Sequence, residues 1–143
     1  MTPIRHLLGV LAAVRLAAGL AGAPLPAAAK GPEPRQISHG QTVKLEDYLV
    51  PGKTTVVDFY SKFCPPCMAL APLIAQLHHT RGDLAVVEVD INRPGVVGID
   101  WNSPVARQFQ LESIPQLTVY GPDGQLVADG LKARELVIGW LGK

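Results

Sequence analysis

Cys64 and Cys67 are the only cysteines among the 143 residues, and two prolines separate them. A spacing of three in a helix puts the second sulfur one turn after the first, so the two sulfurs can form and open a disulfide. The attacking species in such an exchange is the thiolate, and an unperturbed cysteine is mostly protonated at neutral pH. The start of a helix favours the thiolate through free N–H groups and the positive end of the helix dipole. The pair therefore predicts dithiol–disulfide chemistry.

The two cysteines are expected to have different tasks. We expect Cys64 to be exposed and to attack a substrate disulfide, and Cys67 to be more covered and to resolve the mixed disulfide. The alternatives are a structural disulfide and half of a metal site. A disulfide that closes so small a loop adds little stability, and a zinc site would need two further ligands, for which the sequence has no second cysteine pair. No metal and no bound cofactor is expected, because the two sulfurs carry the electrons.

A strand, a helix and a second strand are predicted around the cysteines. Residues 54–60 are rich in β-branched and aromatic side chains, and their apolar centre is broken only by Asp58, which is typical of a strand buried on both faces. A helix is predicted over residues 65–79, and a second buried strand over 84–89. A strand–helix–strand unit of this spacing predicts parallel strands.

The other segments complete a mixed sheet. Residues 41–45 alternate polar and apolar side chains, which favours an edge strand, and 46–49 favour a helical turn. Ser103 and Pro104 are a typical cap and first residue of a helix through position 108. Later segments predict a hairpin of two strands and a closing helix, over 116–120, 125–128 and 133–141. The predicted fold class is α/β, with a mixed central sheet and helices on both faces.

The first 29 residues have the pattern of a secretory signal peptide. A short polar start, an apolar run and small residues before position 30 follow one another. The alternative is a membrane anchor over residues 7–29, although Arg15 interrupts its apolar run. We interpret 1–29 as a signal peptide, 30–39 as a linker and 40–143 as one domain, and expect an extracytoplasmic location such as the periplasm.

Composition excludes several other classes of protein. The chain is 48% hydrophobic and 17% charged with a formal charge of +1, and it has no run of Lys or Arg that could follow a phosphate backbone. We therefore expect no nucleic-acid partner. We expect the protein to be a monomer.

Residues 56–67 resemble the active-site strand and loop of the thioredoxin family. Pro72, five residues after Cys67, matches the proline in the long helix of that family, and Gly130 matches the glycine after its hairpin. Ile114 and Pro115 match the family's cis-proline pair. The resemblance covers residues 40–142 with one insertion, and it implies a thioredoxin-like fold and a thiol–disulfide oxidoreductase.

The resemblance also implies roles for the residues around the cysteines. Asp58 matches the carboxyl that assists deprotonation of the resolving cysteine, here Cys67, and a buried carboxyl has by itself a raised pKa. A cis Pro115 would expose the backbone of Ile114 to substrate. The predicted catalytic residues are therefore Cys64, Cys67 and Asp58, and the predicted substrate-binding residues are Phe63, Pro65, Pro66, Ile114 and Pro115.

Three features depart from the family pattern. Phe63 replaces a tryptophan and cannot donate a hydrogen bond. The position of a lysine near the buried Asp is interpreted as Val86, and the lost charge should raise the pKa of Asp58. The segment before Pro115 is longer, and its apolar residues over 93–102 either dock a partner or fold back over the sheet edge.

The expected activity is reduction of protein disulfides, with a membrane or soluble electron donor as recycling partner. If Cys64 caps the helix, Pro66 removes one of the two N–H groups that could stabilise its thiolate. A less stabilised reduced form favours electron donation. Two alternatives remain, a disulfide-forming oxidant of exported proteins and a copper-binding metallochaperone module whose two thiolates are soft ligands.

Overall fold

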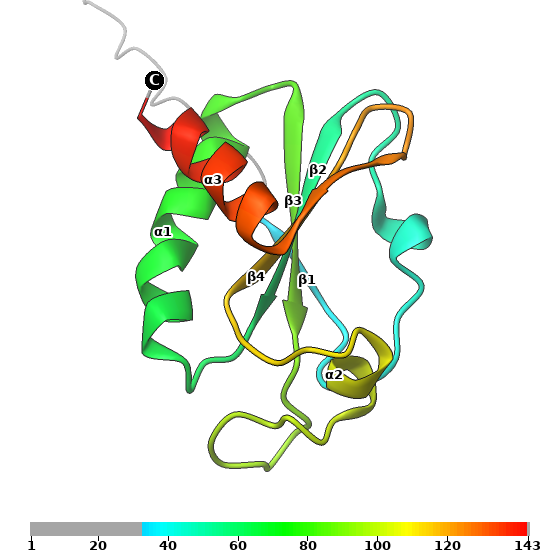
Figure 1. Ribbon diagram of the computed structural model, residues 1–143, viewed down its shortest axis with the longest axis vertical. Helices are drawn as coiled ribbons and strands as arrows, with labels where there is room; N and C mark the ends of the chain where they lie inside the picture. The colour runs from blue at the N-terminus through cyan, green and yellow to red at the C-terminus, as the bar shows by residue number, and fades with distance from the viewer. Residues whose placement is uncertain (1–32, 143) are drawn as a thin grey trace, which may run out of the picture.

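The computed structural model describes residues 33–142 and shows five strands in one sheet, in the order β1-β3-β2-β4-β5 (Figure 1). The first three strands run parallel to one another, and β4 and β5 are antiparallel to their neighbours. The sheet is therefore mixed, as predicted. The strands are β1 (Arg35–Ile37), β2 (Thr54–Tyr60), β3 (Leu84–Asp90), β4 (Gln116–Tyr120) and β5 (Leu126–Asp129).

The helices in the described part of the chain are α1 (Pro65–Thr80), α2 (Pro104–Gln108), α3 (Gly130–Leu141) and the 3-10 helix η1 (Leu45–Tyr48). Of these, η1, α1 and α2 connect strands, and α3 follows the last strand. The β2–α1–β3 unit, its parallel pairing and the Ser103 cap of α2 are confirmed. Within residues 33–142, no helix has the length and apolarity needed to cross a membrane.

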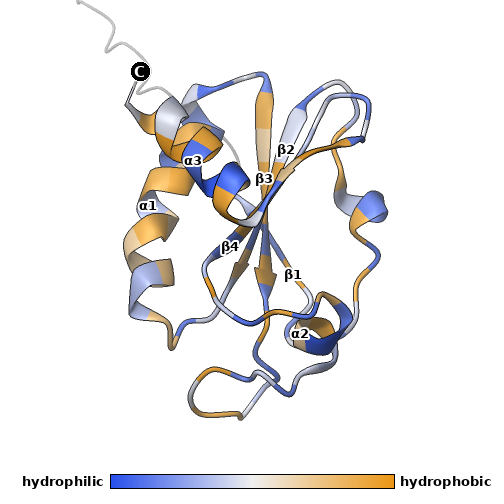
Figure 2. Ribbon diagram, in the orientation of Figure 1, coloured by the Kyte–Doolittle hydropathy of each residue, from blue (hydrophilic) through white to orange (hydrophobic). Residues whose placement is uncertain are grey.

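Helices cover both faces of the sheet. The core between the sheet and α1 with α3 contains Val56, Ile74 and Val137, whereas the core toward α2 and η1 contains Phe59 and Val105. Figure 2 shows the hydrophobic residues concentrated in the central strands and along α1 and α3. Since side chains alternate along a strand, the side chain of Asp58 points to the same face as Val56, toward α1.

The first strand is not where the sequence pattern placed it. Residues 41–45 are not a strand; β1 lies at Arg35–Ile37, inside the segment interpreted as a linker, and pairs with β3. Only Ile37 of its three residues is buried, so the segment is too short to show the alternation of polar and apolar residues that predicts a strand. A turn of residues with positive φ, Ser38, His39 and Gly40, then takes the chain away from the sheet. The predicted signal peptide lies outside the described residues.

Candidate active site

Cys64 is the N-cap of α1 and is joined to Cys67 by a disulfide, with their Cα atoms 5.3 Å apart. The sulfur of Cys64 accepts a hydrogen bond from the backbone N–H of Cys67, with a nitrogen–sulfur distance of 3.2 Å. Pro65 and Pro66 occupy the first two positions of the helix and are exposed. The predicted helix start is therefore confirmed, and one backbone N–H remains to stabilise a thiolate on Cys64.

The expected exposure of Cys64 is wrong for this disulfide-bonded form. Cys64 is 2% exposed and Cys67 is 1% exposed, so burial does not distinguish them. The reason is the loop before β4, which brings the carbonyl oxygen of Ile114 to 3.6 Å from the Cys64 sulfur. The two cysteines differ instead in their hydrogen bonding, because the sulfur of Cys64 accepts the capping N–H.

The peptide bond between Ile114 and Pro115 is cis, as the family resemblance implied. Both residues are half-buried, and the backbone of Ile114 faces the dithiol. Phe63 is also half-buried, and the ammonium nitrogen of the exposed Lys62 lies 5.1 Å from the centre of its ring. The structure thus places the backbone of Ile114 next to Cys64. Substrate binding by these residues stays a prediction.

Asp58 is buried in the middle of β2, with 1% of its surface exposed. Its neighbours across the sheet are Glu88 on β3 and Leu117 on β4, and its Oδ1 atom has no hydrogen-bond partner among the described residues. Burial, together with the smaller effect of the negative charge of nearby Glu88, raises the pKa of Asp58 to about 7. The expectation of a raised pKa is confirmed, and a proton-transfer role stays a prediction.

The charged neighbour of Asp58 across the sheet is Glu88, not a residue at position 86. Val86, interpreted as the position of the family's lysine, pairs with Val56 and packs in the apolar core. The residue beside Asp58 is Glu88, so the site has gained a negative charge rather than only lost a positive one. The parallel register itself could have shown this, because it pairs Thr54 with Leu84 and hence Asp58 with Glu88.

The longer segment after β3 is held by its own polar contacts. Arg93 binds the buried carboxylate of Asp100 through two hydrogen bonds of 2.7 and 3.0 Å, and this pairing lowers the pKa of Asp100. Ile99 packs against the core, whereas Val97 and Trp101 are exposed, Val97 by 87%. The expectation that 93–102 folds back is therefore confirmed for Ile99, whereas docking of a partner by the exposed apolar residues stays a prediction.

The two histidines at the end of α1 contact other protein groups. Nδ1 of His78 accepts a hydrogen bond from the backbone N–H of Val86 at 3.0 Å, and Nε2 of His79 lies 3.5 Å from the carboxylate of Glu33. Among residues 33–142, no group of three or more His, Cys, Asp or Glu side chains is arranged to hold a metal ion.

The family model for thioredoxin matches residues 39–137. The chain belongs to the thioredoxin family. It is 37% identical to a thioredoxin of Mycobacterium tuberculosis over 82 residues, which cover 57% of this chain and 63% of that protein. It is 31% identical to a thioredoxin of Chlamydia pneumoniae over 99 residues, which cover 68% of this chain and 88% of that protein.

Solved thioredoxins have the same fold. A mutant thioredoxin from Halobacterium salinarum superposes with a TM-score of 0.53 at 21% identity, covering 76% of this chain and 88% of that one. Thioredoxin f2 of Chlamydomonas reinhardtii superposes with a TM-score of 0.52 at 25% identity, covering 73% and 91%. The match to the first curated relatives spans 62–63% of their length.

Proposed function

We propose that this member of the thioredoxin family is a thiol–disulfide oxidoreductase that reduces disulfides in proteins through Cys64 and Cys67. The observation that carries the proposal is the placement of this dithiol: it begins α1, its first sulfur accepts a backbone N–H, and it follows a strand that holds a buried carboxyl, Asp58. Each of these features serves thiol exchange, and a purely structural disulfide needs none of them.

The reaction begins from the reduced pair. The Cys64 thiolate attacks one sulfur of the substrate disulfide, a mixed disulfide forms, and the other substrate sulfur leaves as a thiolate. The Cys67 thiol then passes its proton to the Asp58 carboxylate and attacks the Cys64 sulfur. The second substrate sulfur leaves as a thiolate, and the disulfide between Cys64 and Cys67 results. Two electrons have moved from the protein to the substrate, and a donor must resupply them.

The surroundings of Cys64 favour reduction over oxidation. Pro65 and Pro66 have no N–H, so of the first three helical positions only Cys67 donates to the Cys64 sulfur. The carbonyl oxygen of Ile114, 3.6 Å away, presents partial negative charge to that sulfur and disfavours a thiolate. Because strong oxidants are those whose reduced form is stabilised, this pair is expected to donate electrons. The exposed Lys62 acts in the opposite direction, but water and salt screen its charge.

Trapping experiments test the reaction. The purified protein should reduce the disulfides of insulin when a chemical dithiol recycles it. Cys67→Ser should accumulate mixed disulfides with substrate, because the resolving thiol is absent, whereas Cys64→Ser should accumulate none. Mixed disulfides that form equally in both variants, or insulin that stays oxidised, would contradict the proposal.

Equilibration with glutathione buffers of graded ratio tests the direction. A reductant should be largely disulfide-bonded in a buffer as oxidising as a secretory compartment, and mass spectrometry after acid quenching and alkylation reads the two forms. A pair that stays reduced there would favour the alternative of a disulfide-forming oxidant. A metal titration of the reduced protein tests the copper-binding alternative, for which tight binding of Cu(I) by both thiolates is the positive result.

We further propose that the protein is exported and works outside the cytoplasm as a monomer, with a membrane or soluble electron donor. The support for export is the signal-peptide pattern of residues 1–29. Residues 1–29 fused to a reporter that folds only after export should give activity, and substituting Arg for apolar residues of the 7–20 run should abolish it. A mature N-terminus close to position 30 indicates cleavage, whereas an intact chain in the membrane fraction indicates an anchor.

A further inference from the structure

Asp58 and Glu88 form a pair of carboxyl groups on the face of the sheet that α1 covers. The register of β2 and β3 places them side by side on neighbouring parallel strands, and both side chains point to the face that α1 covers. Neighbouring strands lie roughly 4.8 Å apart, so two carboxylates in this position repel one another strongly when both are ionised. The proposed mechanism uses Asp58 alone and leaves Glu88 without a task.

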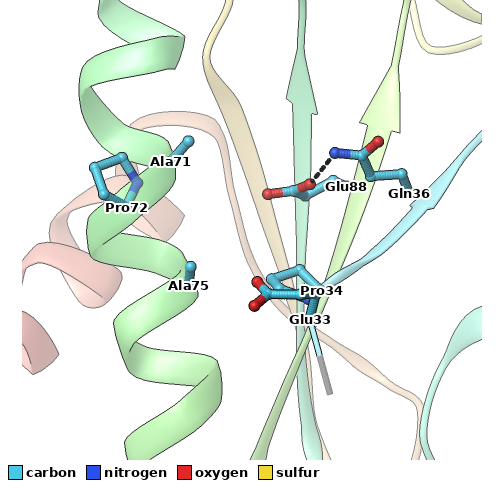
Figure 3. Close-up of a pocket in the computed structure, with 7 residues that line it drawn as sticks. All are labelled: Glu33, Pro34, Gln36, Ala71, Pro72, Ala75 and Glu88. Carbon is cyan, nitrogen blue, oxygen red and sulfur yellow. Dashed lines mark hydrogen bonds between the residues drawn. The ribbon is translucent and has the colours of Figure 1, made fainter. Parts of the chain in front are cut away.

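Glu88 differs from Asp58 in its access to water. It lines a solvent-open cavity of about 550 Å³ between α1 and the β1–β3 edge of the sheet, and Asp58 does not line it. The wall formed by α1 consists of small or ring-closed residues, Ala71, Pro72 and Ala75, which leave room above the carboxylate (Figure 3). Nε2 of Gln36 donates a hydrogen bond of 3.0 Å to Glu88 and holds it at the cavity wall.

We propose that Glu88 is a positioning residue for thiol exchange: its carboxylate, hydrated from this cavity, keeps the proton on Asp58 and so sets the pH range in which Asp58 can take the proton of Cys67. The inference rests on the proposed function. Two neighbouring carboxyls, one of them sealed from water in the core, resist carrying negative charge at the same time. A negative Glu88 then makes the ionisation of Asp58 unfavourable.

Other titratable groups lie at other positions of the elements around this pair. On the same face of the sheet, Tyr60 and Asp90 follow at the end of the two strands. The cavity wall contributes one more carboxyl, Glu33, which lies 3.5 Å from His79 of α1. The titratable residues of α1, which packs on this face, are Cys67, His78 and His79. None of the charged ones is adjacent to Asp58 in the register, as Glu88 is.

Glu88→Gln tests the proposal, because it removes the charge and keeps the size and an acceptor for Gln36. The pH midpoint of single-turnover insulin reduction should fall by about half to one pH unit, a roughly 3- to 10-fold change in the proton affinity of Asp58. Glu88→Asp, which keeps the charge, should have the same pH midpoint as the wild type. Glu33→Gln is the matched control, since it removes a carboxylate from the same cavity at a distance from Asp58 and should leave the midpoint unchanged.

The same substitution in an Asp58→Asn background separates Glu88 from a general electrostatic effect. If Glu88 acts through Asp58, Glu88→Gln should shift nothing there, and an equal shift in both backgrounds would overturn the proposal. An equal shift in Glu33→Gln would also overturn it. Carbon-13 NMR titration of the Asp58 carboxyl measures the same change in its proton affinity without any turnover. If the protein reduced no disulfides, the proposed function would be contradicted, but the NMR test of Glu88 would still apply. Glu88→Ala provides a second variant without charge if Glu88→Gln does not fold.

Discussion

Cys64 and Cys67 are chemically alike in sequence, and the structure separates them by one hydrogen bond. The Cys67 N–H donates to the sulfur of Cys64, and no described backbone N–H donates to the sulfur of Cys67. A donor pointed at a sulfur favours its thiolate form. The nearly equal burial of the two residues therefore does not remove the basis for assigning Cys64 as the attacking thiol.

Alkylation of the reduced protein should show this difference. At mildly acidic pH, iodoacetamide should label Cys64 before Cys67, because Cys64 is expected to have the lower thiol pKa. Peptide mass spectrometry over a time course measures the order. The single variants Cys64→Ser and Cys67→Ser give the intrinsic rate of each remaining thiol. Faster labelling of Cys67 would reverse the assignment of attacking and resolving thiols.

Asp58→Asn should slow thiol exchange at and above neutral pH. Burial raises the pKa of Asp58 to about 7, so its ionised form, which can accept the Cys67 proton, grows as the pH rises through that value. General-base assistance contributes roughly 100-fold or more when the group is well placed. The wild-type rate of the resolving step should rise with a midpoint near 7, and the variant should lose both the rise and most of the rate.

Stopped-flow tryptophan fluorescence or acid-quenched mixed disulfides can measure that step. Glu112→Gln, which neutralises an exposed carboxyl, is the control for a change of net charge. If Asp58→Asn retains the wild-type pH profile, Asp58 has a structural role and no part in proton transfer.

The elements that position the dithiol could be predicted from the sequence, since their signals are strong. β2 and β4 have the predicted bounds, because a continuous apolar run and a hairpin turn are local patterns. β1 was missed because three residues with one buried side chain give no alternation. Glu88 was missed because its importance depends on the register of two strands, which sets it beside Asp58.

Gly40 is another position that the sequence did not reveal. It lies where the chain leaves β1: its N–H donates to the carbonyl of Asp90 and its carbonyl accepts from Val105, so it joins β1, β3 and α2. Its φ is +81°, and a Cβ there would lie 2.6 Å from the backbone nitrogen of Arg93. Only glycine fits both the conformation and the space.

Gly40→Ala should therefore destabilise the fold by about 2 kcal/mol or more, from the left-handed conformation and the backbone clash together. Gly82→Ala is the matched control and should change stability little, because Gly82 has no positive φ and a Cβ there would meet no atom beyond its chain neighbours within 4 Å. Urea unfolding followed by circular dichroism compares the two. Equal unfolding free energies of the two variants would show that the backbone around Gly40 can shift to accept a Cβ with little loss of stability.

At the scale of the whole molecule, the core on both faces of the sheet buries Asp58 and so raises its pKa. α1 and α3 on one face and α2 on the other remove water from both sides of β2, so a carboxyl placed at its centre is buried. Burial of an ionisable group costs free energy whenever the group must be charged. The fold therefore loses stability in the pH range in which Asp58 ionises.

The sign of this effect follows from proton linkage. The pKa of Asp58 is raised from 3.8 in the unfolded chain to about 7 in the folded protein, so between these values the folded state binds more protons. The contribution of Asp58 to stability is thus most favourable below the unfolded value, falls as the pH rises, and is fully lost above about 7. A shift of this size corresponds to an upper bound on the order of 4 kcal/mol.

Asp58→Asn removes this pH dependence, because an amide does not ionise. Relative to the wild type, the variant should gain on the order of 2–4 kcal/mol of unfolding free energy between pH 4 and pH 8. Urea denaturation of the disulfide-bonded proteins at several pH values measures the difference. Carboxylates whose pKa is lowered by pairing, such as Asp100, contribute with the opposite sign but equally in both proteins, so they cancel. A difference in stability that stays constant across this range would mean that Asp58 ionises in the folded protein as readily as in the unfolded chain.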